Sequence, residues 1–112
     1  MSGPQAGRRA LVTGAAAGIG AAVAQRLADD GAHVTVADVD GDRAAQFAAQ
    51  IGGTPWAVDL TDTAALADLT LDTDILVHNA GIQHVSPIQD FEPEWFHRIL
   101  ALMVEAPFLL TR

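Results

Sequence analysis

The sequence contains no cysteine, no tyrosine and no lysine. Without cysteine there is no disulfide framework, no thiolate nucleophile and no cysteine-based metal site, as expected of a cytoplasmic protein. The six basic residues are outnumbered by fourteen acidic ones, which gives a formal net charge of −8. A protein that neutralises phosphates needs a basic face, so we expect no nucleic acid and no anionic membrane as partner. The acidic residues themselves are typical of solvated helix faces and caps.

The chain has 112 residues, half of them hydrophobic, which is enough for one small globular domain. Residues 1–7 form a short tail of glycine, proline, glutamine and alanine without the apolar core of a signal peptide, and we expect this tail to be flexible. Residues 8–112 remain for the fold.

Short apolar runs alternate with helical patterns along residues 8–112, which predicts a parallel sheet with right-handed crossovers. We expect a doubly wound α/β fold with strand order 3-2-1-4 and a ligand crevice where the order reverses, between strands one and four. The expected strands are residues 10–12, 33–38, 54–58 and 74–78.

Four helical segments separate or follow these strands. The first contains apolar residues at four-residue spacing and is closed by Gly31 as a left-handed residue. The second is capped by Asp40 or Asp42 and ends at the pair Gly52 and Gly53. A short third helix follows Thr61 and Asp62, and a long one runs from Pro93 to Arg112. The residues expected to face inward on the second and third helices are Ala44, Phe47, Ala48, Ile51, Ala65, Leu66 and Leu69.

A glycine-rich turn joins the first strand to the first helix. Gly14 permits a sharp turn, Gly18 permits close approach of a phosphate to the backbone, and Gly20 permits close packing of helix on sheet. Ala17 and Ile19 lie between these glycines. The helix N-terminus offers free N–H groups and a positive dipole end, so the turn predicts a dinucleotide pyrophosphate site.

Asp38 ends the second strand, 24 residues after Gly14. A carboxylate at this place can accept both hydroxyls of an adenosine ribose and repels a 2′-phosphate. Two charges 4 Å apart repel by at most about 4 kcal/mol at an effective dielectric of 20, and a quarter of that favours NAD over NADP about fivefold. The alternative is that Asp38 only caps a turn.

Four features in register resemble the short-chain dehydrogenase/reductase family: Thr-Gly-x-x-x-Gly-Ile-Gly, Asp38, Asp59-Leu60 after the third strand, and Asn79-Ala80-Gly81 after the fourth. The resemblance implies a Rossmann fold that binds NAD. It further implies that Asp59 meets the adenine amino group, that Leu60 lies beside the ring, and that the Asn79 segment lines the ribose and braces the sheet. On their own residues, Asp59 and Asn79 are equally typical of turns.

The segment from Asn79 to Val85, with Pro87, Ile88 and Phe91, is similar to the D-3-hydroxybutyrate dehydrogenases of that family. The resemblance implies that Gln83 helps to hold the substrate carboxylate, to which a side-chain amide can donate. The implied reaction is NAD-dependent oxidation of a secondary alcohol, a hydroxy acid such as 3-hydroxybutyrate. The alternative is that Gln83 and His84 are ordinary surface-loop residues.

The family's catalytic residues are a serine, a tyrosine and a lysine four residues later, and none of these has a counterpart here. The only serines, Ser2 and Ser86, are not at an expected strand end. We therefore expect the N-terminal half of a dehydrogenase, either truncated or the product of a shortened gene, that is inactive by itself since it lacks a general acid. A non-catalytic dinucleotide-binding module is the alternative. Met103 stands where the family usually has an asparagine that holds a water of the proton relay.

The last helix is expected to be an interface. From residue 99 to residue 110, ten of twelve residues are apolar, interrupted only by Glu105 and Pro107. Such a helix is too short for a bilayer and belongs in an interior or between subunits. The family resemblance likewise implies a dimer interface here. We expect a homo-oligomer through residues 93–112.

Overall fold

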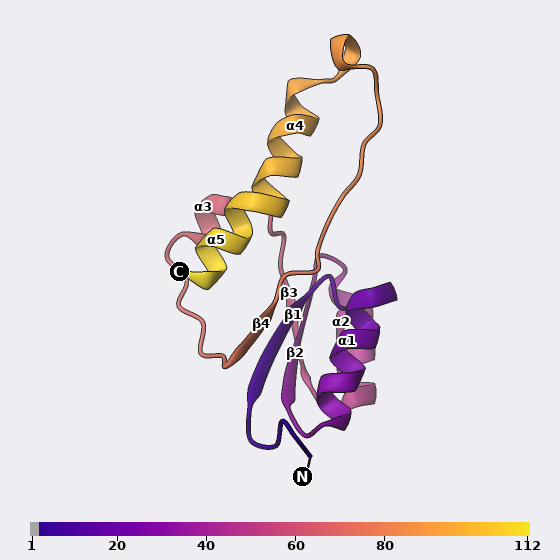
Figure 1. Cartoon of the computed structure of the whole chain (residues 1–112), viewed down its shortest axis with the longest axis vertical. Helices are drawn as coiled ribbons and strands as arrows, with labels where there is room; N and C mark the ends of the chain where they lie inside the picture. The colour runs from indigo at the N-terminus through magenta and orange to yellow at the C-terminus, as the bar shows by residue number, and fades with distance from the viewer. Residues whose placement is uncertain (1–2) are drawn as a thin grey trace. The chain divides into compact units, whose positions relative to one another are not determined.

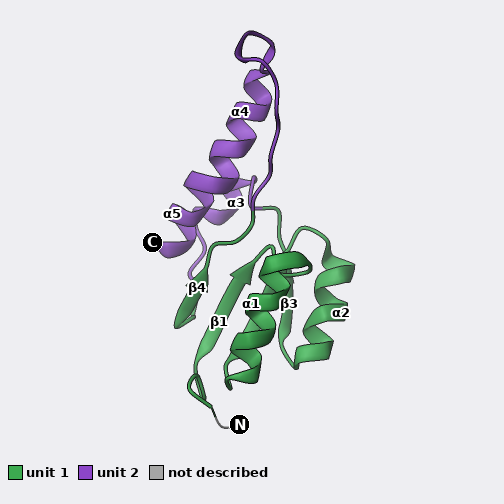
Figure 2. Cartoon of the chain, turned by 45° about the vertical axis from the view of Figure 1, so that its right-hand side comes forward, with its two compact units in different colours: residues 1–59, 72–80 green, residues 60–71, 81–112 purple. Residues whose placement is uncertain are grey.

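The computed structural model describes residues 3–112. They divide into two compact units, coloured separately in Figure 2. The first contains the residues up to Asp59 together with Asp72–Ala80, and the second contains Leu60–Leu71 with Gly81–Arg112.

The first unit is built on a four-stranded parallel sheet (Figure 1). Its order is β3-β2-β1-β4, which confirms the predicted order and the α/β class. β1 pairs with β2 along its full length, from Arg9 opposite His33 to Thr13 opposite Ala37. The strands are β1 Arg9–Thr13, β2 His33–Asp38, β3 Thr54–Ala57 and β4 Ile75–Val77.

Two helices, α1 (Gly18–Asp29) and α2 (Gly41–Ile51), cover one face of this sheet (Figure 1). The Asp40 side chain caps α2 by accepting a hydrogen bond from the Arg43 N–H at 3.1 Å, so the first of the two predicted caps is correct. Alanines on the helices allow close packing against strand valines. The buried core contains Ala10, Val12, Ala15, Ala24, Ala28, Ala32, Val34, Val36, Ala44 and Ala48.

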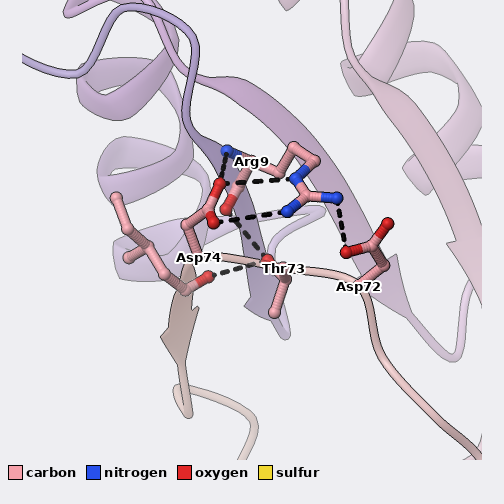
Figure 3. Close-up of polar contacts among 5 residues, drawn as sticks. Arg9, Asp72, Thr73 and Asp74 are labelled. Carbon is pink, nitrogen blue, oxygen red and sulfur yellow. Dashed lines mark hydrogen bonds and ion pairs between the residues drawn. The ribbon is translucent and has the colours of Figure 1, made fainter.

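An arginine fork ties the amino-terminal ends of β1 and β4 together (Figure 3). The Arg9 guanidinium donates to both carboxylate oxygens of Asp74, at 3.3 Å each, and forms an ion pair with Asp72. The Arg9 backbone N–H also donates to Asp74, at 2.8 Å, and Thr73 Oγ1 donates to the Arg9 carbonyl. These contacts hold the pKa of Asp74 below its ordinary value, first through the side-chain hydrogen bond from Arg9.

Both edges of the sheet lie in this unit. β3 pairs only with β2 among the described strands, and Pro55 is its second residue.

Ahead of β1, the predicted tail is described from residue 3, and residues 1–2 lie outside the described part. Within it the Gln5 N–H donates to the Asp30 carbonyl at 2.8 Å.

The second unit is helical, with α3 (Thr63–Leu66), a 3-10 turn (Ile88–Asp90), α4 (Pro93–Leu100) and α5 (Ala106–Thr111). Asp62 caps α3 by accepting from the Ala65 N–H. The predicted inward face of α3 is partly wrong, since Leu66 is buried but Ala65 and Leu69 are exposed. With only four residues, α3 is a single turn and presents one inward position. No helix within residues 3–112 combines the length and the apolar character needed to cross a bilayer.

The predicted single helix from Pro93 to Arg112 is interrupted by a π-helical turn, Ala101–Glu105. There the Ala106 N–H donates to the carbonyl of Ala101, five residues earlier. The π-helical turn is explained by Pro107, because proline has no N–H to donate the next α-helical hydrogen bond. Apolar residues line both sides of this stretch: Leu102, Ala106 and Leu110 are buried, whereas Met103, Val104 and Phe108 are exposed.

Candidate functional site

The loop between β1 and α1 turns at two glycines with positive φ, Gly14 at 63° and Gly18 at 60°. A Cβ added to Gly14 would lie 2.9 Å from the Ala80 Cα, so β4's continuation packs directly on this turn. A Cβ added to Gly18 would meet nothing within 4 Å. The backbone of Gly18 therefore faces open space, as a loop that admits a ligand against its main chain requires.

Helix α1 begins at the rim of that open space. Ala17 precedes it in an extended conformation and has no side chain that can cap the first-turn N–H groups. Ile19 is 77% exposed, whereas a Cβ on Gly20 would lie 2.3 Å from the Gly14 carbonyl oxygen. The helix thus starts tight against the turn with its positive dipole end uncovered, which suits a bound anion.

The Asp38 carboxylate lies beside the same loop. One of its oxygens accepts a hydrogen bond from the Ala16 N–H at 3.1 Å, and the other accepts from the Asp40 N–H at 3.0 Å. An ionised carboxylate has about four acceptor sites, so about two remain for a ligand. Asp38 is half-buried and fixed in place by backbone donors from both directions.

Thr13 links the glycine turn to the end of β4. Its hydroxyl accepts hydrogen bonds from the N–H groups of Asn79 and Ala80, both at 3.0 Å, and donates to the Val77 carbonyl at 3.4 Å. The Asn79 side-chain amide donates to the Gly14 carbonyl at 3.2 Å. Thr13 is 1% exposed, and its single donor and two acceptor positions are all used.

The first unit therefore brings together most of the predicted site at the carboxyl ends of β1, β2 and β4. Asp59 is exposed at the boundary of this unit. Leu60, Gly81 and Gln83 belong to the second unit, where Leu60 is buried and the other two are exposed. The residues gathered around the glycine turn are Gly14, Ala17, Gly18, Ile19, Gly20, Asp38, Asn79 and Ala80.

Sequence reasoning missed two members of this site. In the sequence, Thr13 stands out only as part of the glycine motif, and nothing indicates a role for Ala16. A threonine at the end of an otherwise apolar buried strand is a usable signal, because a buried hydroxyl needs hydrogen-bond partners. Ala16 contributes only its backbone N–H, which no side-chain pattern shows. Among residues 3–112 there is no group of three or more histidine, aspartate or glutamate residues that could hold a metal ion.

The profile of the short chain dehydrogenase family matches residues 8–112. An oxidoreductase of Bacillus subtilis, the uncharacterised YxjF, is 42% identical over 116 residues, which is 92% of this chain and 45% of that protein. The D-beta-hydroxybutyrate dehydrogenase of Cupriavidus necator is 38% identical, over 95% of this chain and 46% of its own length. Galactitol 2-dehydrogenase of Agrobacterium fabrum is also 38% identical, over 92% and 44%.

The chain spans about half the length of these curated relatives. Among solved structures, the 3-ketoacyl-(acyl-carrier-protein) reductase of Brucella melitensis, complexed with NADH, superposes with a TM-score of 0.85 at 36% identity. That match covers 96% of this chain and 49% of the reductase.

Proposed function

The chain belongs to the short-chain dehydrogenase family, and on this premise we propose that it is the NAD-binding half of an oxidoreductase that acts on a secondary alcohol. The observation that carries the proposal is the uncovered N-terminus of α1 beside the open backbone of Gly18, with the Asp38 carboxylate fixed on the same loop.

The glycine turn fits a pyrophosphate in its chemistry. The first-turn N–H groups of α1 donate, the dipole end is positive, and no Cβ obstructs Gly18. The remaining acceptor positions of Asp38 suit the two hydroxyls of the adenosine ribose, and a 2′-phosphate there would face a carboxylate. These features support NAD over NADP.

Further cofactor contacts are proposed from the family resemblance. Asp59 would receive the adenine amino group, and Leu60 would lie beside the ring. Asn79, Ala80 and Gly81 would line the ribose. The hydrogen bonds from Asn79 and Ala80 to Thr13 support their part of this proposal, because they fix that backbone next to the glycine turn.

The proposed substrate is a hydroxy acid such as 3-hydroxybutyrate, with the exposed Gln83 amide donating to its carboxylate. NAD, when bound, would supply the hydride acceptor for the carbinol carbon, and a base would have to take the hydroxyl proton as the ketone forms. The family's tyrosine and lysine have no counterpart in these 112 residues, so the proposal assigns this base to no residue of the chain. We expect the chain alone to be inactive.

The proposal includes self-association through the last helical stretch, residues 93–112. Five large apolar side chains there are between 42% and 61% exposed, which supports a partner surface. They are Phe96, Leu100, Met103, Val104 and Phe108. The proposal also places the protein in the cytoplasm, for which its lack of cysteine is the support.

Titration calorimetry of the chain with NADH and with NADPH tests the cofactor assignment. We expect saturable heat from NADH and weaker binding of NADPH. An absence of NADH binding at millimolar concentration by a folded sample would refute the proposal.

A second candidate function is that of a non-catalytic dinucleotide-binding module, favoured by the missing tyrosine and lysine. The two candidates are separated by combining this chain with the catalytic half of the Cupriavidus necator relative. NADH formation from 3-hydroxybutyrate supports the dehydrogenase, whereas NADH binding without turnover supports the module.

A further inference from the structure

Residues 81–87 form no helix or strand, yet one of their side chains is firmly packed. The imidazole of His84 stacks on the indole of Trp95, with centroids 4.4 Å apart and ring planes within 3° of parallel. Phe91 meets the same imidazole edge-on, at 5.3 Å and 80°. All three residues belong to the second unit, so His84 fastens this segment to the beginning of α4.

Arg98 adds to the cluster from the next turn of α4. Its guanidinium carbon lies 5.1 Å from the centroid of the Trp95 ring, within the range of a cation–π contact. The His84 ring is thus held between Phe91 and Trp95, and the Trp95 ring contacts both His84 and Arg98. Such aromatic pairs contribute beyond the area that they bury, because edge-to-face and stacked rings have preferred geometries.

The exposure of the side chains alternates along residues 82–85. Ile82 and His84 are half-buried, whereas Gln83 and Val85 are exposed. The aromatic cluster takes up the His84 side chain, whereas the Gln83 side chain makes none of these ring contacts and stays exposed.

We propose that His84 is a positioning residue, whose stack on Trp95 and Phe91 holds residues 81–87 so that Gln83 meets the substrate carboxylate. This proposal rests on the function proposed above, because the stack by itself does not identify a substrate. The imidazole acts here through its flat ring, and phenylalanine at position 84 is therefore an adequate replacement.

The first experiment measures backbone order by ¹⁵N relaxation of the chain without ligand. We expect rigid amides in residues 82–86 of the unchanged chain and of the His84→Phe variant, and order parameters below about 0.6 in His84→Ala. His97→Ala is the matched control, since His97 is an exposed histidine on α4, the helix that carries Trp95. A segment that is equally ordered in His84→Ala, or already flexible in the unchanged chain, overturns the proposal.

The second experiment titrates the NAD-saturated chain with D-3-hydroxybutyrate and follows the side-chain amide signal of Gln83. We expect His84→Ala to raise the Kd about three- to tenfold, the cost of about one aromatic pair, with the Kd of NAD unchanged. His84→Phe should restore the Kd.

The outcomes separate the two proposals. A loss of NAD binding refutes the proposed function. The relaxation data still test, independently of NAD, whether the stack of His84 on Trp95 orders residues 82–86. A disordered segment with an unchanged hydroxybutyrate Kd reduces His84 to a structural residue. Equal weakening by His84→Ala and His84→Phe indicates direct contact through an imidazole nitrogen, and no binding by the unchanged chain excludes Gln83 as the anchor. Each of these three results overturns the positioning role.

Discussion

The side-chain amide of Asn79 donates a hydrogen bond to the backbone carbonyl of Gly14 over 3.2 Å. Asn79, two residues after the end of β4, therefore holds the turn that follows β1. Thr13 reinforces this link through its two bonds to the backbone of Asn79 and Ala80. The shape of the glycine turn depends on contacts made from a strand more than sixty residues later in the chain.

Replacing Thr13 by valine keeps the side-chain shape and removes the hydroxyl. The N–H groups of Asn79 and Ala80 then lose their acceptor in a partly buried site. We expect the free energy of unfolding to fall by about 1–3 kcal/mol and NADH to bind more weakly. Chemical denaturation and calorimetry measure the two effects, with Thr35→Val in β2 as the matched control. An unchanged denaturation midpoint would contradict the role given to this hydroxyl.

Replacing Asp38 by serine removes the charge that faces a 2′-phosphate. We expect the preference for NAD over NADP to narrow by about fivefold, measured as the ratio of the two Kd values. Asp42→Ser is the control, because Asp42 is an exposed aspartate in the first turn of α2. If the ratio stays the same in Asp38→Ser, Asp38 is a capping residue and does not select the cofactor.

Acid should weaken the fork that joins β1 and β4. The Arg9 hydrogen bond lowers the folded-state pKa of Asp74 below its ordinary 3.8, so the unfolded chain binds this proton more readily. The stabilisation is thus complete above pH 3.8 and is lost as the pH falls through the folded-state pKa. Thermal melting from pH 7 to pH 2 should show Asp74→Asn less stable than the unchanged chain near neutrality, with the difference shrinking as the pH falls below 3.8. A constant difference across the range would argue against this linkage.

The exposed apolar side of the last helical stretch should drive association. Val104 and Phe108 are each 61% exposed, so Val104→Lys with Phe108→Lys leaves the buried residues in place. Sedimentation velocity should show self-association of the unchanged chain and a shift toward monomer in this pair. Gln46→Lys with Gln50→Lys adds the same charge on exposed positions of α2 and should leave association unchanged. A monomeric, sharply melting unchanged chain would exclude this surface as an interface.

Much of the first unit could be predicted from sequence because its signals are local. β2 occupies His33–Asp38 as predicted, since β-branched residues between a glycine and an aspartate define its ends. The order of strands followed from alternating strands and helices with right-handed crossovers. Asp40 caps the start of α2 and Gly52 caps its end, and both caps depend on neighbours within one turn.

The features that escaped prediction depend on backbone bonds or on distant partners. The π-helical turn arises because Pro107 removes one N–H, and hydrophobic periodicity does not record which carbonyl loses its donor. The bond from Ala16 to Asp38 involves a backbone donor, which has no sequence signature. The stack of His84 on Trp95 joins two residues eleven positions apart across an irregular segment, so neither helical nor strand spacing reveals it.

The two borders of the sheet differ in their capacity to recruit another strand. β3 is four residues long and contains Pro55, which has no donor for a new neighbour, and short borders with proline resist edge-to-edge pairing. β4 presents Ile75, Leu76 and Val77, all with intact N–H groups and strand-forming side chains. We therefore expect growth of this sheet to be directional, with an incoming strand from the same or another polypeptide adding beside β4 in preference to β3.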